Sequence, residues 1–359
     1  MSKPVCLVTA PVATRSGYGA HGRDICRALI KLDKYDVKIW PVRWGNTPMN
    51  ALNKDDPNDK MIIDRILPNP QLPKQPELHI HIVIPNEFQT FGKYNIGITA
   101  GLEMTACPPG WLEGMNKMNM NIVPSTFVKD MITNIKFDIN NEQDGKKVGE
   151  LKSDKPIEVL FEGTDTNIFK KTNEFSKEFV DEMKKVKESF NFLYVGHWLQ
   201  GDLGKDRKDT GMMLKVFLET FKNLKQKPVI ATNWSGHLDF LNKNLAVLVG
   251  GGLQNVEKGS VPDEFLTEGA QWFTVNYQEA SAKMKDVYKS YKKYTLDAKK
   301  LGTVNKSKFS LNAMTKELGK ILDKYVPEFP KEVKLELPKL KKVGSTDLPK
   351  IKLPKLKKV

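Results

Sequence analysis

The stretch that decides the fold opens the sequence: VCLV (residues 5–8), then SGYG (residues 16–19), then Ile25, Ala28, Leu29 and Leu32 at helical spacing. This order of apolar strand, glycine turn and amphipathic helix is typical of the first unit of an open parallel α/β sheet. Gly17 and Gly19 lack a Cβ, so backbone can approach a ligand closely, and a helix beginning at about residues 20–23 points free N–H groups at it. The turn therefore predicts a diphosphate site. An ordinary tight turn is the alternative, because the full G-x-G-x-x-G pattern is absent.

Length and composition predict two globular domains. The chain has 359 residues, of which 40% are hydrophobic, and this is enough for a buried core in each domain. The three cysteines, Cys6, Cys26 and Cys107, are far apart, and the first two lie on the apolar faces of the opening strand and helix. We expect reduced core thiols in a cytoplasmic protein. No apolar stretch approaches the length of a membrane span, so none is expected.

Half of the net charge of +14 comes from residues 331–359, which hold ten lysines and three acidic residues. This segment contains LPKLKKV twice, at residues 337–343 and 353–359. Repeated proline prevents a helix and alternating lysine prevents a packed strand, so we expect a disordered basic C-terminal tail. The tail is either a polybasic arm that makes weak contact with nucleic acid or another acidic partner, or a solvated segment with no specific role.

Apolar runs alternate with helical stripes along the first half of the chain, which predicts a mostly parallel sheet. Ser125 is the expected N-cap of one of the helices. Residues 138–155 are polar and charged, so we expect a loop there. The expected strands are residues 36–40, 78–84, 94–100, 121–123 and 156–161, and the expected helical stripes are residues 111–118 and 128–135.

The strand-then-helix pattern begins again in the middle of the chain. Residues 192–195 form an apolar run, residues 201–209 a polar loop with Arg207 and Lys208, and a helical stripe follows at residues 214–224. The loop cations lie after a strand and beside a helix N-terminus, which favours a phosphate site; a solvated loop is the alternative. Further on we expect a strand at residues 245–249, a glycine connector or phosphate loop at 250–252, and helices over 284–291 and 311–325.

His79 and His81 are two residues apart in the expected strand 78–84, so they lie on one face of it and could ligate a metal ion. No cysteine or acidic cluster joins them at ligand spacing. We therefore expect no metal site.

Five stretches together carry a family resemblance. The chain resembles retaining nucleotide-sugar glycosyltransferases of GT-B architecture, in the broad group that includes glycogen and sucrose synthases, and in particular the variants of large bacteriophages. The resemblance implies two Rossmann-like domains facing a cleft, with the acceptor mainly on the first and the nucleotide-sugar donor mainly on the second. It also implies a donor used as substrate, with no metal cofactor. The matching stretches are SGYG (16–19), IVPSTFVK (122–129), EGTDTNIF (162–169), LYVG (193–196) and PVIATNWSGH (228–237).

The resemblance assigns the donor diphosphate to residues from both domains. Gly17 and Gly19 would face it, and Lys208, with Arg207 as a second candidate, would take the place of the family's basic residues that neutralise the leaving group. Many relatives have an arginine directly after the strand glycine, where this chain has His197. One phosphate contact of the family is therefore in question.

Two further residues are candidates for the reaction itself. Glu103 and His81 follow or end expected strands, so we expect them to point toward the cleft and to hydrogen-bond the transferred sugar or the acceptor. A structural role is the alternative for each.

The second domain departs from the family pattern. Only 31 residues separate Gly196 from Pro228, where the family carries several more strand–helix units, and the EGFG motif that binds the donor is absent. We therefore expect a truncated second domain. The expected organisation is an acceptor domain at residues 1–175, the truncated donor domain at 176–305, a helix returning to the first domain at 306–326, and the tail at 327–359.

The sequence thus predicts a glycosyltransferase that transfers a sugar from a nucleoside-diphosphate sugar to an acceptor hydroxyl. The acceptor is not determined, and modified bases in DNA are one candidate for a phage-like member. A non-catalytic remnant that acts as a binding module is the alternative, because the donor-binding glutamate motif is missing. A nucleic-acid-binding protein is a third, and it depends on the tail alone.

Overall fold

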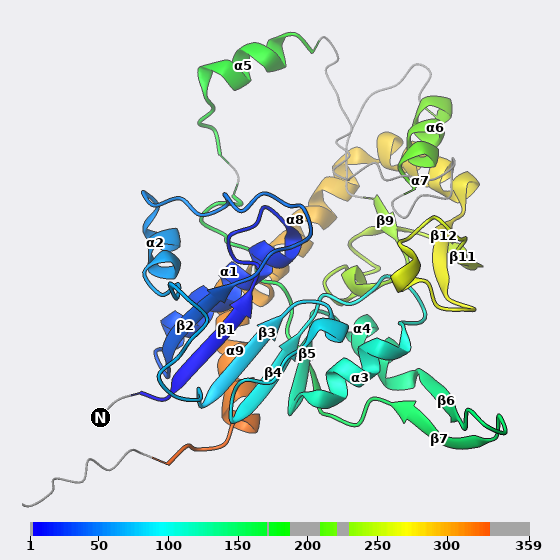
Figure 1. Cartoon of the computed structure of the whole chain (residues 1–359). Helices are drawn as coiled ribbons and strands as arrows, with labels where there is room; N and C mark the ends of the chain where they lie inside the picture. The colour runs from blue at the N-terminus through cyan, green and yellow to red at the C-terminus, as the bar shows by residue number, and fades with distance from the viewer. Residues whose placement is uncertain (1–2, 171, 187–208, 221–229, 331–359) are drawn as a thin grey trace, which may run out of the picture.

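A six-stranded parallel sheet lies at the centre of the first part of the chain (Figure 1). The computed structural model describes residues 3–170, 172–186, 209–220 and 230–330. The strand order is β2-β1-β3-β4-β5-β8. The chain adds β2 on one side of β1 and the later strands on the other side, as in doubly wound Rossmann-like folds. The predicted α/β class is therefore confirmed. The strands are β1 (Val5–Ala10), β2 (Asp36–Pro41), β3 (Leu78–Ile82), β4 (Tyr94–Ile98), β5 (Met120–Val123) and β8 (Ile157–Val159).

Helices cover both faces of this sheet. One face packs on α1 (Gly17–Leu32) and α9 (Leu311–Tyr325), with α2 (Pro57–Ile63) beside α1. Cys6 and Cys26 are free and buried in this core, as expected of reduced thiols. The other face packs on η1 (Pro85–Glu87), α3 (Pro109–Lys117) and α4 (Thr126–Asn134). Strand residues alternate between the two cores because successive side chains point to opposite faces.

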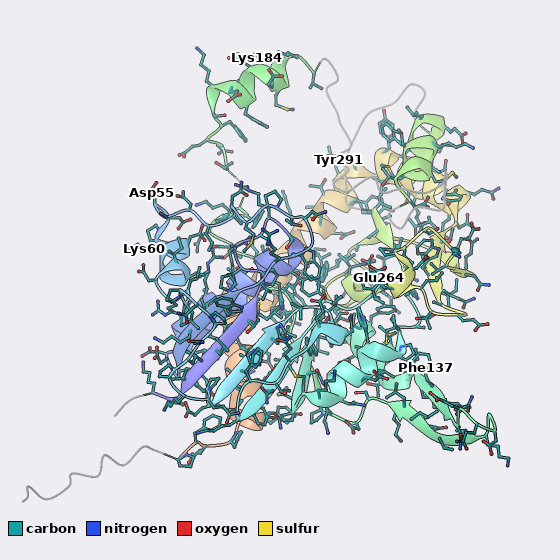
Figure 2. The ribbon with its side chains drawn as sticks, in the orientation of Figure 1. Asp55, Lys60, Phe137, Lys184, Glu264 and Tyr291 are labelled. Carbon is teal, nitrogen blue, oxygen red and sulfur yellow. The ribbon has the colours of Figure 1, made fainter. Side chains whose placement is uncertain are left out.

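Residues 138–155 are not the expected loop. They contribute to a hairpin of β6 (Lys136–Asn140) and β7 (Lys147–Lys152), which extends away from the sheet in Figure 1. Its ion pairs run diagonally across the two strands, as in Lys147–Asp138 at 2.7 Å, whereas the directly paired Lys136 and Lys152 carry like charges, as do Asp138 and Glu150. Figure 2 shows Phe137 at the base of the hairpin, where it packs on the second core.

The second part of the chain contains a smaller α/β unit. Its described strands are a parallel pair, β9 (Ile230–Thr232) and β10 (Val247–Val249), and an antiparallel pair, β11 (Gly251–Asn255) and β12 (Gln271–Val275). Residues 251 and 252 are thus strand residues rather than a connector or a phosphate loop. This unit packs on α6 (Thr210–Thr220) and α7 (Tyr277–Lys289). The small buried core at this contact consists of Val216, Val249 and Ala280. The expected strand at 192–195 lies outside the described residues.

The chain then returns to the first sheet. The helical stripe expected over 284–291 is divided at Ser290 between α7 and α8 (Tyr291–Lys308), a helix that the sequence did not predict. After it, α9 packs on α1, and both Lys324 and Tyr325 hydrogen-bond Glu158, at 2.7 and 2.5 Å. Residues 331–359, where we expect the basic tail, lie outside the described residues.

The short helix α5 (Lys177–Lys184) stands apart from the rest of the protein in Figure 1. Its sequence predicts an apolar face, but Phe175 and Phe179 stack on each other and stay 56% and 48% exposed. In the described part of the chain, no helix combines the length and apolar character that a membrane span requires.

Candidate active-site cleft

Two adjoining cavities lie between the first sheet and the second unit. The larger, of about 700 Å³, is lined by residues that follow β4, β5 and β8 and by η2 (Gly236–Asp239) of the second unit. The smaller, of about 350 Å³, is lined by the ends of β9 and β10 and by residues of α6 and α7. Glu103, Ser235 and His237 line both cavities. Ligands of α/β proteins bind at such carboxyl ends of parallel strands, so these two cavities, the cleft, form the candidate active site.

The cleft is closed on one side by direct contact between the two units. Ser125 caps α4 as predicted, because its Oγ accepts the Val128 N–H at 3.3 Å. Gly236 approaches this cap so closely that a Cβ at Gly236 would lie 2.7 Å from the Ser125 Oγ. Asp239 Oδ2 accepts the Thr126 N–H at 2.8 Å. The motifs IVPSTFVK and NWSGH, distant in the sequence, therefore meet at the cleft.

The turn after β9 holds a strained residue at the junction of the two cavities. Ser235 has φ 84° and ψ −178°, a region of backbone conformation that only glycine adopts readily. The ring of the preceding Trp234 packs edge-on to Phe127 and parallel to Phe273, with centroids 4.7 and 5.9 Å apart. These contacts fix the turn, and such strain is common at functional sites.

His237 follows the strained turn, and a hydrogen bond to the backbone fixes the role of one of its ring nitrogens. Its Nε2 lies 2.6 Å from the Thr232 carbonyl oxygen, so Nε2 carries a proton and donates it there. Nδ1 of the neutral ring is then a hydrogen-bond acceptor. Sequence analysis missed this residue, although it ends the stretch PVIATNWSGH.

Glu103 is the predicted site residue that the structure brings into the cleft. It follows β4, is exposed, and lines both cavities. A carboxylate there can accept hydrogen bonds from the hydroxyl groups of a ligand that extends through both cavities. Its role in a reaction stays a prediction.

A hydrogen-bonded group at the carboxyl edge of the sheet connects α1 to the cleft. The Tyr18 hydroxyl lies 2.9 Å from the Thr99 Oγ1 and accepts the Ala100 N–H at 3.1 Å, and its ring stacks on Trp44 at 4.2 Å. Burial raises the pKa of Tyr18, which keeps the hydroxyl protonated. Ala100 lines the larger cavity, so Tyr18 supports the cleft wall.

Glu162 lines the same cavity and contacts a buried histidine. Its Oε1 lies 3.5 Å from Nδ1 of His21, which is 6% exposed. Burial lowers the pKa of His21, and the Glu162 carboxylate acts in the opposite direction. The sequence signals that could have identified Tyr18 and Glu162 were their places in SGYG and EGTD.

The two glycines of SGYG have different environments. Helix α1 begins at Gly17, earlier than expected, because Ser16 Oγ accepts the Gly19 N–H at 2.9 Å and caps it. Gly19 is buried, and a Cβ there would lie 2.4 Å from the Thr14 carbonyl oxygen, whereas Gly17 is exposed with open space around it. Neither glycine lines the two cleft cavities. The start of α1 packs so closely on the loop before it that position 19 has no room for a side chain, which explains the glycine there.

The predicted phosphate-binding cations, Arg207 and Lys208, lie outside the described residues. Asp209, which follows them, lines the smaller cavity and accepts a hydrogen bond from the Tyr277 hydroxyl at 3.0 Å.

The structure does not bring His81 into the cleft beside Glu103. His81 lines another cavity, of about 940 Å³, on the sheet face opposite α1, and we call this the sheet-face cavity. The His81 Nδ1 accepts the Gln89 N–H at 3.0 Å, and burial lowers the pKa of His81 to about 4. Burial likewise lowers the pKa of the adjacent His79 to about 3. Within the described ranges, no group of three or more His, Cys, Asp or Glu residues is arranged to hold a metal ion.

Comparisons with known proteins give a likeness in structure but none in sequence. The sequence matches no protein-family model and no curated protein. The structure is similar to the crystal structure of a glycosyltransferase from Rickettsia africae ESF-5, with a TM-score of 0.50 and 13% sequence identity. The likeness covers 90% of this chain and 99% of that chain. At this identity it shows the fold alone: a Rossmann-like α/β fold, as the sequence predicted.

Proposed function

We propose that the chain is a glycosyltransferase that transfers a sugar from a nucleoside-diphosphate sugar to an acceptor hydroxyl. The observation that carries the proposal is the pair of adjoining cavities at the carboxyl ends of strands from both units, which Glu103, Ser235 and His237 line together. Such a pair suits a ligand with two parts, a nucleotide and a sugar. The fold likeness to a glycosyltransferase and the five sequence stretches support the same activity.

We further propose that the enzyme has GT-B architecture, is of the bacteriophage type and retains the anomeric configuration of the transferred sugar. In this reaction, side chains would neutralise the charge of the leaving group. Lys208, with Arg207, would contact the diphosphate without a metal ion, and fixed positive groups at a departing anion stabilise the transition state. Their neighbour Asp209 lines the smaller cavity, which supports this assignment. Glu103 would hydrogen-bond the transferred sugar or the acceptor.

Thermal shift with nucleotides and turnover of their sugars test the proposal. We expect UDP or GDP to raise the melting temperature, because a ligand that binds only the folded state stabilises it. Lys208→Ala should abolish this shift, and Glu103→Gln should keep the shift but reduce donor hydrolysis or transfer. Lys54→Ala, a charge loss on an exposed residue outside both cavities, is the matched control. If no nucleotide or nucleotide sugar changes the melting temperature, the proposal fails.

A binding module without catalysis is the second candidate. Two observations favour it: the described parallel pair of the second unit has only three residues in each strand, and the EGFG motif is missing from the sequence. This candidate predicts that a nucleotide sugar stabilises the protein but is neither hydrolysed nor transferred to any acceptor. Measured turnover that Glu103→Gln removes would rule it out.

A further inference from the structure

The sheet-face cavity contains a row of three side chains that the strand register places side by side. Thr9 of β1 pairs with Trp40 of β2 on one side and with His81 of β3 on the other. Because neighbouring strands lie about 4.8 Å apart, the three side chains form a continuous strip on one face of the sheet. All three line the cavity, and none of its lining residues lines the cleft.

His81 presents a fixed hydrogen-bond donor to this cavity. Its Nδ1 accepts the Gln89 N–H at 3.0 Å, so the neutral ring carries its proton on Nε2. Among the described residues, no group accepts a hydrogen bond from Nε2, which remains accessible from the cavity. A ligand acceptor in the cavity could therefore take this hydrogen bond.

Thr9 supplies a second donor beside it. The His79 Nδ1 accepts the Phe91 N–H at 3.4 Å, so His79 Nε2 carries the proton and donates it to the Thr9 Oγ1 at 3.0 Å. The Thr9 hydroxyl then directs its own proton elsewhere. The floor of the cavity thus holds the His81 Nε2 donor and the Thr9 hydroxyl next to the Trp40 ring.

The charges around the cavity favour an anion. Its charged lining residues are Arg43, Lys74, Lys117 and Glu87, with Lys74 also 3.5 Å from the buried Glu77. An anion gains more from this excess of cations than a neutral sugar does. The aromatic rings of Trp40 and Phe91 suit a flat ring on the same ligand.

We propose that the sheet-face cavity binds a mononucleotide, with its phosphate on His81, Thr9 and the surrounding cations and its base against Trp40. The cavity of about 940 Å³ is large enough for such a ligand. This site is separate from the proposed donor site and does not depend on the proposed activity.

Isothermal titration of the full chain with AMP tests the site. His81→Phe removes the Nε2 donor and keeps a ring, and Arg43→Ala and Lys117→Ala change exposed residues with little effect on folding. We expect each variant to weaken AMP binding by about tenfold, the usual effect of losing one hydrogen bond to a charged group. Lys54→Ala, outside the cavity, and Lys208→Ala, in the proposed donor site, should leave the affinity unchanged.

Three results would overturn the proposal. The first is the absence of AMP binding to the unmodified chain. The second is AMP binding that Arg43→Ala and Lys117→Ala do not weaken. The third is AMP binding that Lys208→Ala removes, because the nucleotide would then occupy the proposed donor site instead.

Discussion

Asp239 of the second unit places its carboxylate at the N-terminus of α4 in the first, where Oδ2 accepts the Thr126 N–H at 2.8 Å. A helix N-terminus carries partial positive charge and unpaired N–H groups, so this contact is a cap supplied by another part of the fold. The cleft is therefore bounded by an interaction that depends on both units.

Asp239→Ala should lower the free energy of unfolding by about 0.5–1 kcal/mol, the usual cost of a lost cap or of a lost anion at a helix start. Urea denaturation measures the change. Glu142→Ala, which removes an exposed carboxylate in the turn between β6 and β7, away from any described helix, is the control. Equal stability of the two variants would contradict the capping role.

Gly19→Ala and Gly17→Ala should have opposite effects, although they are two residues apart in one helix turn. A Cβ at Gly19 would lie 2.4 Å from the Thr14 carbonyl oxygen, so this variant should lose about 1–3 kcal/mol through forced movement of backbone. A Cβ at Gly17 meets nothing within 4 Å, so alanine should stabilise the protein by about 0.4–1 kcal/mol. Thermal unfolding of both variants checks the difference in sign.

Ser235→Gly should raise stability, because glycine adopts φ 84° and ψ −178° without the strain of a side chain. The relief of about 1–3 kcal/mol exceeds the entropy of about 0.5–1 kcal/mol that glycine loses on folding. Ser235→Ala keeps the strain and serves as the control. A melting temperature of Ser235→Gly at or below that of Ser235→Ala would show that the turn is not strained.

Stability should fall as the pH drops from 6.5 toward 4, because the rings of His79 and His81 are buried in the neutral form. Burial lowers the pKa of His79 to about 3 and that of His81 to about 4, both below the unfolded value of 6.5. The unfolded chain therefore binds protons that the folded chain does not, and their contribution to stability is fully present only above pH 6.5.

In this pH window each of these histidines lowers the free energy of unfolding by at most about 1.4 kcal/mol per pH unit. Urea denaturation across the window measures the slope. His81→Gln should reduce the slope by about one proton, since the glutamine does not titrate and its amide oxygen can still accept the Gln89 N–H. An unchanged slope would mean that His81 titrates normally in the folded protein.

Most of the central sheet could be predicted from the sequence, because each strand is a short apolar run bounded by turn residues, as at Val5–Ala10 and Leu78–Ile82. The hairpin of β6 and β7 could not, since most of its residues are exposed and polar or charged, so only a short apolar pattern marks its strands. Helix α8 was missed because it has no buried face that a helical stripe would reveal.

The candidate site was predictable only in part. Glu103 could be identified because a residue that follows a parallel strand lies at the carboxyl edge. His81 lies within β3 rather than after it, and its side chain faces away from α1, into a separate cavity. The contact of His21 with Glu162 joins residues far apart in the chain, and no local pattern signals it.

The position of α9 has a consequence for how the protein is made. Met314, Leu318 and Leu322 complete the same core as β1 and α1, although the whole second unit is translated between them. On the ribosome, the N-terminal sheet therefore emerges without the helix that covers it, and it waits with an uncovered apolar surface until residue 325 has been synthesised. We therefore expect a nascent chain that stops before α9 to be a target for chaperones and proteases.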